Sequence, residues 1–147
     1  ISEDTGILLK PHTELVLTPH IKEMSRLRGE GASYIKENLI RVAEDFSREY
    51  QVITHLKDSA SVTAIPFRET YICTSGNNGM ATAGSGDVLS GIIAGLMVSG
   101  APADTAASLG AYIHGRAGDI MAEEKGKISL MAGDILSGLP KIYKGLY

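Results

Sequence analysis

Apolar and polar positions along the chain alternate in patterns that predict both strands and helices. The apolar run at 15–18 is closed by Pro19 and predicts a buried strand. A short helix is predicted at 21–27, ending near Gly29. A longer amphipathic helix, capped by Ser33, is predicted to follow and to cover a sheet. Its apolar positions recur at helical spacing: Ile35, Leu39, Val42 and Phe46.

Three short strands are predicted next, at 51–56, 61–65 and 70–73, with short connections between them. The last strand leads into a glycine-rich turn. A helix is predicted at 87–99 and would pack closely through its small residues. These are Ser90, Gly91, Ala94 and Gly95.

Two further helices are predicted in the last third of the chain. Pro102 suits the first turn of a helix that runs from 103 to about 124, and residues 134–139 and the tail are predicted to be helical. Strands that alternate with helices predict an α/β layered fold.

Composition narrows the class of protein. The chain has 147 residues, 44% of them hydrophobic and 21% charged, which is typical of one globular domain. The net charge of −3 and the lack of a Lys/Arg block argue against nucleic acid or an anionic membrane as a partner. The longest mostly apolar stretch, 88–98, is too short to span a bilayer. Cys73 is the one cysteine, which fits a reducing, cytoplasmic location.

The glycine-rich run at 77–87 carries the strongest candidate chemistry. Its glycines allow a ligand to approach the bare main chain, and Asp87 stands where the next helix is predicted to begin. Free backbone amides and the helix dipole at such a position favour a phosphate. A carboxylate beside a phosphate site points to phosphoryl transfer, although Asp is also a common N-cap residue.

The segment 79–96, GMATAGSGDVLSGIIAGL, resembles the signature of the ADP/ATP-dependent NAD(P)H-hydrate dehydratases, a ribokinase-like family. Four further stretches agree in family order: 16–27, 54–64, 111–119 and 129–139. The resemblance implies a three-layer αβα ribokinase-like fold, of which residues 1–147 form the C-terminal part of one catalytic domain. Ile1 is not an initiator methionine, which also suggests a part of a longer protein.

The resemblance implies a reaction in which hydrated NADH or NADPH is restored to the normal cofactor. ADP or ATP, accompanied by Mg²⁺, phosphorylates the ring hydroxyl, and phosphate is then eliminated. Asp87 would be the catalytic residue that accepts the hydroxyl proton. Gly84, Ser85 and Gly86 would form the anion hole, and Asn77 and Asp87 would contact the substrate.

The remaining candidates also come from the resemblance. Lys57, Asp58, Ser59, Ala60 and Ser61 match the family's nucleotide-binding segment, with Gly86 as a further nucleotide contact. Asp58 replaces a family glycine, and Ile21 and Lys22 replace a Pro-Gly pair. The family also implies homo-oligomers.

Histidine and methionine positions have less specific interpretations. His20 follows a predicted strand, and the family resemblance implies that it binds the substrate. Glu23 is either a substrate contact or an acidic residue in the first turn of the short helix. His114 is predicted to pack or to bond a helix to a loop. The four histidines and Cys73 lack zinc-ligand spacing, so no protein-held metal is predicted. Core positions are predicted for Met80, Met97 and Met131.

Two alternative hypotheses remain at this point. A ribokinase-like kinase for a small hydroxylated metabolite would use the same Asp87 and anion hole. A nucleotide-binding or assembly fragment without activity would use neither for turnover.

Overall fold

A computed structural model describes residues 4–10 and 14–144, which divide into two compact units, 1–72 and 73–147. The first unit contains η1 (Thr5–Leu9), β1 (Val16–Leu17), α1 (Ile21–Arg28), α2 (Ala32–Glu37), α3 (Leu39–Tyr50), β2 (Ile53–Leu56) and β3 (Ser61–Ala64). The boundary falls within β4 (Tyr71–Cys73). The second unit contains η2 (Asn78–Met80), α4 (Ser85–Val98), α5 (Ala103–Lys125), η3 (Lys127–Ser129) and α6 (Ala132–Lys144).

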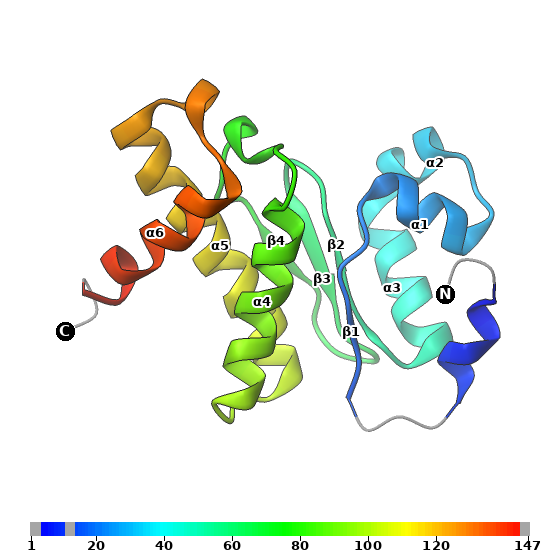
Figure 1. Cartoon of the computed structure of the whole chain (residues 1–147). Helices are drawn as coiled ribbons and strands as arrows, with labels where there is room; N and C mark the ends of the chain where they lie inside the picture. Colours follow the sequence, from blue (N-terminus) through cyan, green and yellow to red (C-terminus); the bar gives the residue numbers. More distant parts are fainter. Residues whose placement is uncertain (1–3, 11–13, 145–147) are drawn as a thin grey trace. The chain divides into compact units, whose positions relative to one another are not determined.

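The sheet has the strand order β1-β2-β3-β4 (Figure 1). β1 and β2 are parallel, with Val16 opposite Ile53, and β2 and β3 are antiparallel, with Thr54 opposite Ala64. An isolated parallel β-bridge between His20 and Lys57 continues the pairing of β1 with β2 beyond the ends of both strands. The ends of β1 and β2 therefore present their following residues at one edge.

The predicted long helix is wrong: two helices, α2 and α3, occupy that segment. Asn38 lies between them with φ −121° and ψ 34°, which interrupts the helix. Ser33 lies inside α2, whose N-cap is Gly31. The apolar spacing still holds across the break, because Ile35, Val42 and Phe46 are all buried.

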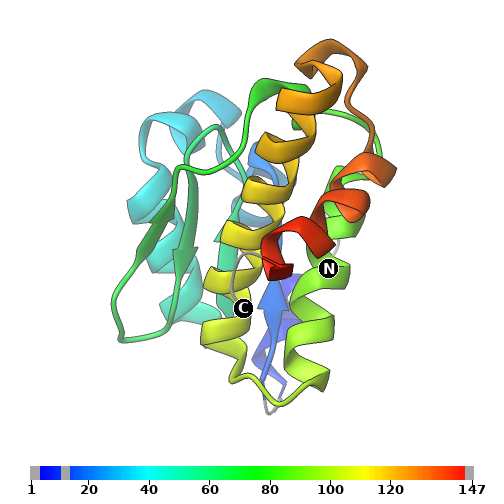
Figure 2. The ribbon, with the colours of Figure 1, turned by 90° about the vertical axis from the view of Figure 1, so that its left-hand side faces the viewer.

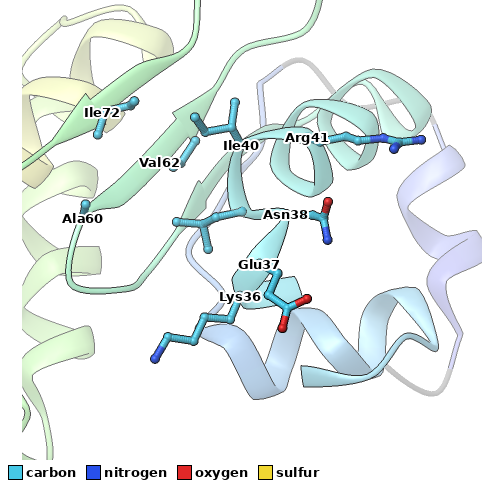
Figure 3. Close-up of a pocket in the computed structure, with 9 residues that line it drawn as sticks. Lys36, Glu37, Asn38, Ile40, Arg41, Ala60, Val62 and Ile72 are labelled. Atoms are coloured by element: carbon cyan, nitrogen blue, oxygen red, sulfur yellow. The ribbon is translucent and has the colours of Figure 1, made fainter. Parts of the chain in front are cut away.

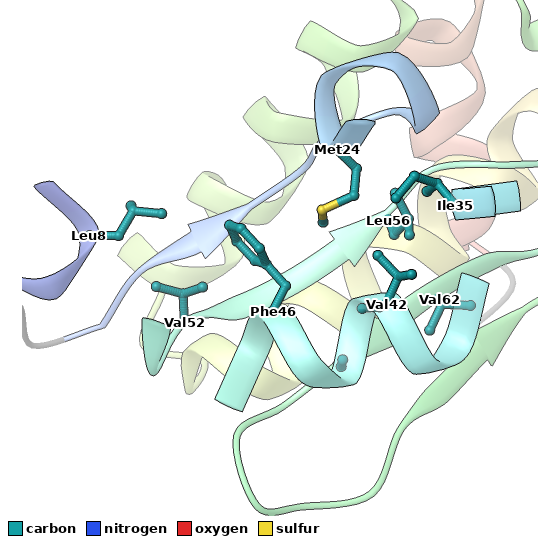
Figure 4. Close-up of a cluster of buried hydrophobic side chains, with 10 residues drawn as sticks. Leu8, Met24, Ile35, Val42, Phe46, Val52, Leu56 and Val62 are labelled. Atoms are coloured by element: carbon teal, nitrogen blue, oxygen red, sulfur yellow. The ribbon is translucent and has the colours of Figure 1, made fainter. Parts of the chain in front are cut away.

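A core of ten buried side chains holds the first unit together (Figure 4). Phe46 and Met24 are fully buried in this core. The ring centroids of Phe46 and Tyr50 lie 4.7 Å apart. The complete cluster is Leu8, Met24, Ile35, Val42, Ala43, Phe46, Val52, Leu56, Val62 and Ala64. The periodicity predicted Ile35, Val42 and Phe46 of this core, whereas Met24 of α1 was not predicted.

Strand and helix ends differ from the predictions by a few residues. The first predicted strand is limited to β1 and is half-buried, and β2 begins two residues late because Gln51 adopts φ 55° at the end of α3. Pro102 is the N-cap of α5 and does not lie in its first turn. Met131 was predicted in the core but is 67% exposed.

Glycines let the segments of the second unit approach one another. A Cβ at Gly110 of α5 would come within 2.7 Å of Ile93 of α4, and one at Gly138 of α6 within 2.8 Å of the Ala117 carbonyl of α5. Figure 2 shows α4 and α5 running side by side. The predicted close packing of α4 through Gly91 and Gly95 is wrong, because both are exposed.

Within the described part of the chain, no helix combines the length and apolar character that crossing a membrane requires.

Candidate active site

The N-terminus of α4 is formed by the glycine-rich run. Gly84 is the N-cap with φ 86°, a left-handed conformation that favours glycine, and no side chain caps the helix. The Ser85 amide donates to the Thr82 carbonyl at 3.3 Å. Among the described residues, the amides of Gly86 and Asp87 have no hydrogen-bond partner. Two amides are therefore oriented for an anion at this helix end.

Asp87 lies in the first turn of α4 and is exposed. The helix begins two residues earlier than predicted, so the alternative role of Asp87 as an N-cap is wrong. Its carboxylate makes no hydrogen bond or ion pair with any described residue. The side chain is thus available to a ligand at the same helix end that carries the two unpartnered amides.

Ser85 has a different environment from its glycine neighbours. It is 8% exposed, and its carbonyl oxygen lies 3.0 Å from Nε2 of His114 on α5. Because a carbonyl only accepts, His114 donates through Nε2, and the Ser85 hydroxyl lies 3.3 Å from the same nitrogen. His114 was expected to pack or to bond a helix to a loop; it does form a hydrogen bond, but its partner Ser85 is the first residue of helix α4.

The loop before η2 is fixed by α5. Asp119 accepts from the Gly76 amide and from Nδ2 of Asn77, both at 3.0 Å, and Oδ1 of Asn77 accepts from the Gly79 amide at 3.0 Å. Sequence reasoning missed Asp119 as an individual residue. Its position at the end of the family-like segment 111–119 was the available signal.

In the first unit, His20 and Glu23 cap α1 reciprocally. Nδ1 of His20 accepts from the Glu23 amide at 3.1 Å, and the Glu23 carboxylate accepts from the His20 amide at 2.8 Å. This arrangement gives Glu23 the helix-starting role. Since Nδ1 is an acceptor, neutral His20 carries its hydrogen on Nε2, and the side chain is 49% exposed.

Lys57 follows β2 at the edge where His20 follows β1. Its amide donates to the Pro19 carbonyl at 2.8 Å, and its Nζ lies 3.9 Å from Oε2 of Glu23. The structure therefore brings His20, Glu23 and Lys57 together. Glu23 lies close enough to offset the lysine charge, and at 3.9 Å the two side chains form an ion pair without a hydrogen bond.

The segment 58–61 forms the turn between β2 and β3. Its fold is local, because the Ser61 hydroxyl donates to the Asp58 carbonyl at 3.1 Å, and Ser59 and Ala60 complete the turn. The Asp58 side chain is half-buried, so the added charge is tolerated in the fold.

A hollow of about 400 Å³ lies beside this turn (Figure 3). Ile40, Val62 and Ile72 contribute apolar walls, while the Arg41 side chain is directed away from them and lies 3.6 Å from Asp45. The full lining is Lys36, Glu37, Asn38, Leu39, Ile40, Arg41, Ala60, Val62 and Ile72. Ala60 is the one predicted nucleotide contact among these lining residues.

The described residues contain no group of three or more His, Cys, Asp or Glu side chains that could hold a metal ion. The two unpartnered amides at the start of α4 instead fit a phosphate group, and the Asp87 carboxylate beside them is a hydrogen-bond acceptor. Mg²⁺ would accompany such phosphates and take most of its ligands from them and from water.

Comparison with known proteins decides the family. Residues 2–141 match the NAD(P)H-hydrate dehydratase family. The chain belongs to this family. It is 48% identical over 146 residues to a bifunctional NAD(P)H-hydrate repair enzyme of Moorella thermoacetica, covering 99% of this chain and 28% of that protein. It is 38% identical over 133 residues to the ADP-dependent (S)-NAD(P)H-hydrate dehydratase of Neisseria meningitidis serogroup B, covering 90% and 45%.

Solved structures support the same family. The ADP/ATP-dependent NAD(P)H-hydrate dehydratase of Bacillus subtilis, co-crystallized with ATP/Mg²⁺ and soaked with CoA, superposes with a TM-score of 0.89 at 25% identity, covering 94% of this chain and 51% of that one. A ribokinase-like protein of Enterococcus faecalis has a TM-score of 0.71 at 28% identity, covering 88% and 44%. The predicted ribokinase-like α/β fold is confirmed. This chain of the NAD(P)H-hydrate dehydratase family spans between 28% and 51% of the length of these relatives.

Proposed function

We propose that this protein restores hydrated NADH or NADPH by a phosphorylation that ADP or ATP supplies, followed by elimination of phosphate. The observation that carries the proposal is the start of α4. There, two unpartnered amides and an exposed carboxylate occupy the family's signature segment. Residues 1–147 would be the C-terminal part of the catalytic domain.

Asp87 is proposed to accept the proton of the substrate's ring hydroxyl. The hydroxyl oxygen attacks the terminal phosphorus of the nucleotide, and the bond from that phosphorus to the bridging oxygen breaks. Charge on the phosphoryl oxygens would be stabilised by the amides of Gly86 and Asp87 and by the dipole of α4. The C–O bond of the phosphate ester then breaks and phosphate leaves, while the adjacent ring carbon loses a proton and the ring double bond forms.

Gly84 and Ser85 are proposed to shape this anion hole. Gly84 supplies the left-handed turn that a side chain would strain, and Ser85 anchors the first turn of α4 to His114. The Ser85 amide is bonded to Thr82, so its contribution is proposed to be positional.

The nucleotide is proposed to bind through Lys57 and the turn of Asp58, Ser59, Ala60 and Ser61, with Gly86 as a contact at the phosphates. A lysine ammonium is a point charge suited to phosphate, and Mg²⁺ would neutralise the remaining charge. His20 is proposed to contact the hydrated ring through its half-exposed side chain, whose Nε2 also lies 3.5 Å from Oε1 of Glu23. Asn77 is proposed to contact the substrate. ADP, ATP and NAD(P)H as ligands support a cytoplasmic location.

Association of copies into a homo-oligomer is proposed from exposed apolar side chains in the first unit. Phe67 is 76% exposed, Ile72 54% and Tyr71 47%. Exposed apolar side chains, where they adjoin, are typical of protein–protein contacts. Sedimentation of the full-length protein tests the proposal, and a monomer at micromolar concentration would reject it.

The central experiment measures return of NADPH absorbance from purified hydrated NADPH, with ADP or ATP added, on the full-length protein. Regeneration must depend on the nucleotide, and inorganic phosphate must appear in equal amount. A phosphorylated product that persists without release of phosphate would instead indicate a small-molecule kinase.

A further inference from the structure

The Asn77 side chain is held by two hydrogen bonds that together fix its orientation. A backbone amide only donates, so the Gly79 amide requires Oδ1 of Asn77. A carboxylate only accepts, so Asp119 requires Nδ2. Both bonds therefore require the same orientation of the Asn77 side-chain amide. One of its two Nδ2 hydrogens remains without a partner among the described residues.

The loop that carries Asn77 is pressed against α5 over several residues. A Cβ at Gly115 would come within 2.6 Å of the Ser75 carbonyl, and a Cβ at Gly118 would overlap the Met80 side chain. Glycine disfavours a helix interior, so α5 gives up helix propensity at two positions to admit this loop. Asp119, which is 23% exposed, then accepts from the Gly76 and Asn77 nitrogens.

We infer that Asp119 is a positioning residue, which aims the remaining Nδ2 hydrogen of Asn77 at an oxygen acceptor of the bound ligand. This inference rests on the proposed function and adds a chemical requirement to it. The acceptor is an oxygen of the hydrated nicotinamide or of the nucleotide phosphate, because Asn77 presents a donor there and uses its oxygen internally.

An exchange of the two side chains separates loop stability from ligand contact. Asn77→Asp places a carboxylate against Asp119, and Asp119→Asn leaves one of two donors without an acceptor. In the double variant Asn77→Asp/Asp119→Asn, the carboxylate at position 77 still accepts from the Gly79 amide. It also accepts from the side-chain amide nitrogen at position 119. The side-chain oxygen at position 119 accepts from the Gly76 amide. All three loop bonds are kept, while position 77 no longer has a donor.

The test uses the full-length protein and compares melting temperature with kinetics. Both single variants are expected to melt lower than wild type, and the double variant is expected to recover. Its kcat/KM is expected to stay about tenfold or more below wild type, which is the loss of one ligand hydrogen bond. A rise confined to the KM of the hydrate or of ADP identifies which ligand supplies the oxygen.

Three results of this comparison of melting and kinetics would overturn the inference. They are an unchanged Asp119→Asn protein, a double variant that does not recover its melting temperature, and a double variant that recovers full kcat/KM. Arg116→Gln is the control, since Arg116 lies 3.6 Å from Asp119 at the surface and makes none of the three loop bonds. It is expected to remain within twofold of wild type.

Calorimetric titrations with ADP and with hydrated NADPH keep this test independent of turnover. Weaker binding of either ligand to the double variant supports the inference even if the wild type does not regenerate NADPH. Failure of the wild type to regenerate NADPH would reject the proposed function and leave the inference about Asp119 standing. Unchanged binding of both ligands would overturn the inference.

Discussion

The start of α4 and the edge formed after β1 and β2 use their polar groups in different ways. At the edge, His20 and Glu23 cap α1, and Lys57 lies 3.9 Å from Glu23. At α4, two amides and the Asp87 carboxylate have no partner among the described residues. Polar groups without internal partners add little to stability and remain available to a ligand.

The difference teaches where function and stability should separate. A change at Asp87 should affect turnover and leave the fold intact, because the native state uses no contact of its side chain. A change at His20 should affect both, because its ring is part of a helix cap.

The largest effect is expected for Asp87→Asn. Loss of a general base lowers kcat by about 10²–10⁴-fold, while the melting temperature should stay within a few degrees of wild type. Regeneration of NADPH and thermal denaturation measure the two quantities. Asp104→Asn, also in the first turn of a helix, is the matched control and should keep full activity. Turnover of Asp87→Asn within a few-fold of wild type would reject the catalytic role.

Phe46→Ala should affect stability in the first unit. Phe46 is fully buried in the core, and truncation of such a side chain costs about 3–5 kcal/mol. Denaturant unfolding measures the change. Phe67→Ala is the control, because that ring is 76% exposed and should contribute little. A loss under 1 kcal/mol for Phe46→Ala would contradict the assigned core.

Gly118→Ala tests the packing of the second unit. The added methyl group would overlap Met80, and overpacking of this kind costs about 1–3 kcal/mol. Gly133→Ala in α6 is the control, because its added Cβ meets no atom within 4 Å and should be neutral or stabilising. If the two variants melted alike, the close approach of Met80 to α5 would be wrong.

His20→Ala should combine two smaller effects. Loss of the cap costs about 1 kcal/mol, and loss of Nε2 should raise the KM of the hydrate. His20→Asn separates them, since an Asn side chain caps well but does not reach as far. Its melting temperature should recover while its KM stays high. Recovery of both would leave His20 with a capping role alone.

The smallest expected effect is a pH dependence in the second unit. Hydrogen bonds from Lys125 and from the Met131 amide lower the pKa of Asp134 below its ordinary value of 3.8. The stability from this carboxylate is thus present above that value and lost as pH falls through the lowered pKa. The melting difference between wild type and Asp134→Asn should shrink below about pH 4. A difference that is constant with pH would contradict this assignment. Glu123→Gln, an exposed change on α5, is the control.

Local sequence signals predicted much of the fold. Apolar spacing located the buried face of α2 and α3, the signals at Gly29 and Pro102 located α1 and α5, and the glycine-rich sequence located the start of α4 to within two residues. The break at Asn38 was not predictable, because the helical periodicity continues through it. Asp119 was also missed, since its importance depends on two donors that lie more than forty positions earlier in the chain.

The sequence by itself determined the family and the chemistry of its signature segment, because backbone freedom at Gly84 and the placement of Asp87 are local properties. The tertiary structure decided which polar groups remain available. Asp119 accepts from the Gly76 amide and from Nδ2 of Asn77, and His114 donates to the Ser85 carbonyl, whereas the amides of Gly86 and Asp87 have no partner among the described residues. Partners are assigned by packing between distant segments, and one-dimensional patterns do not contain that information.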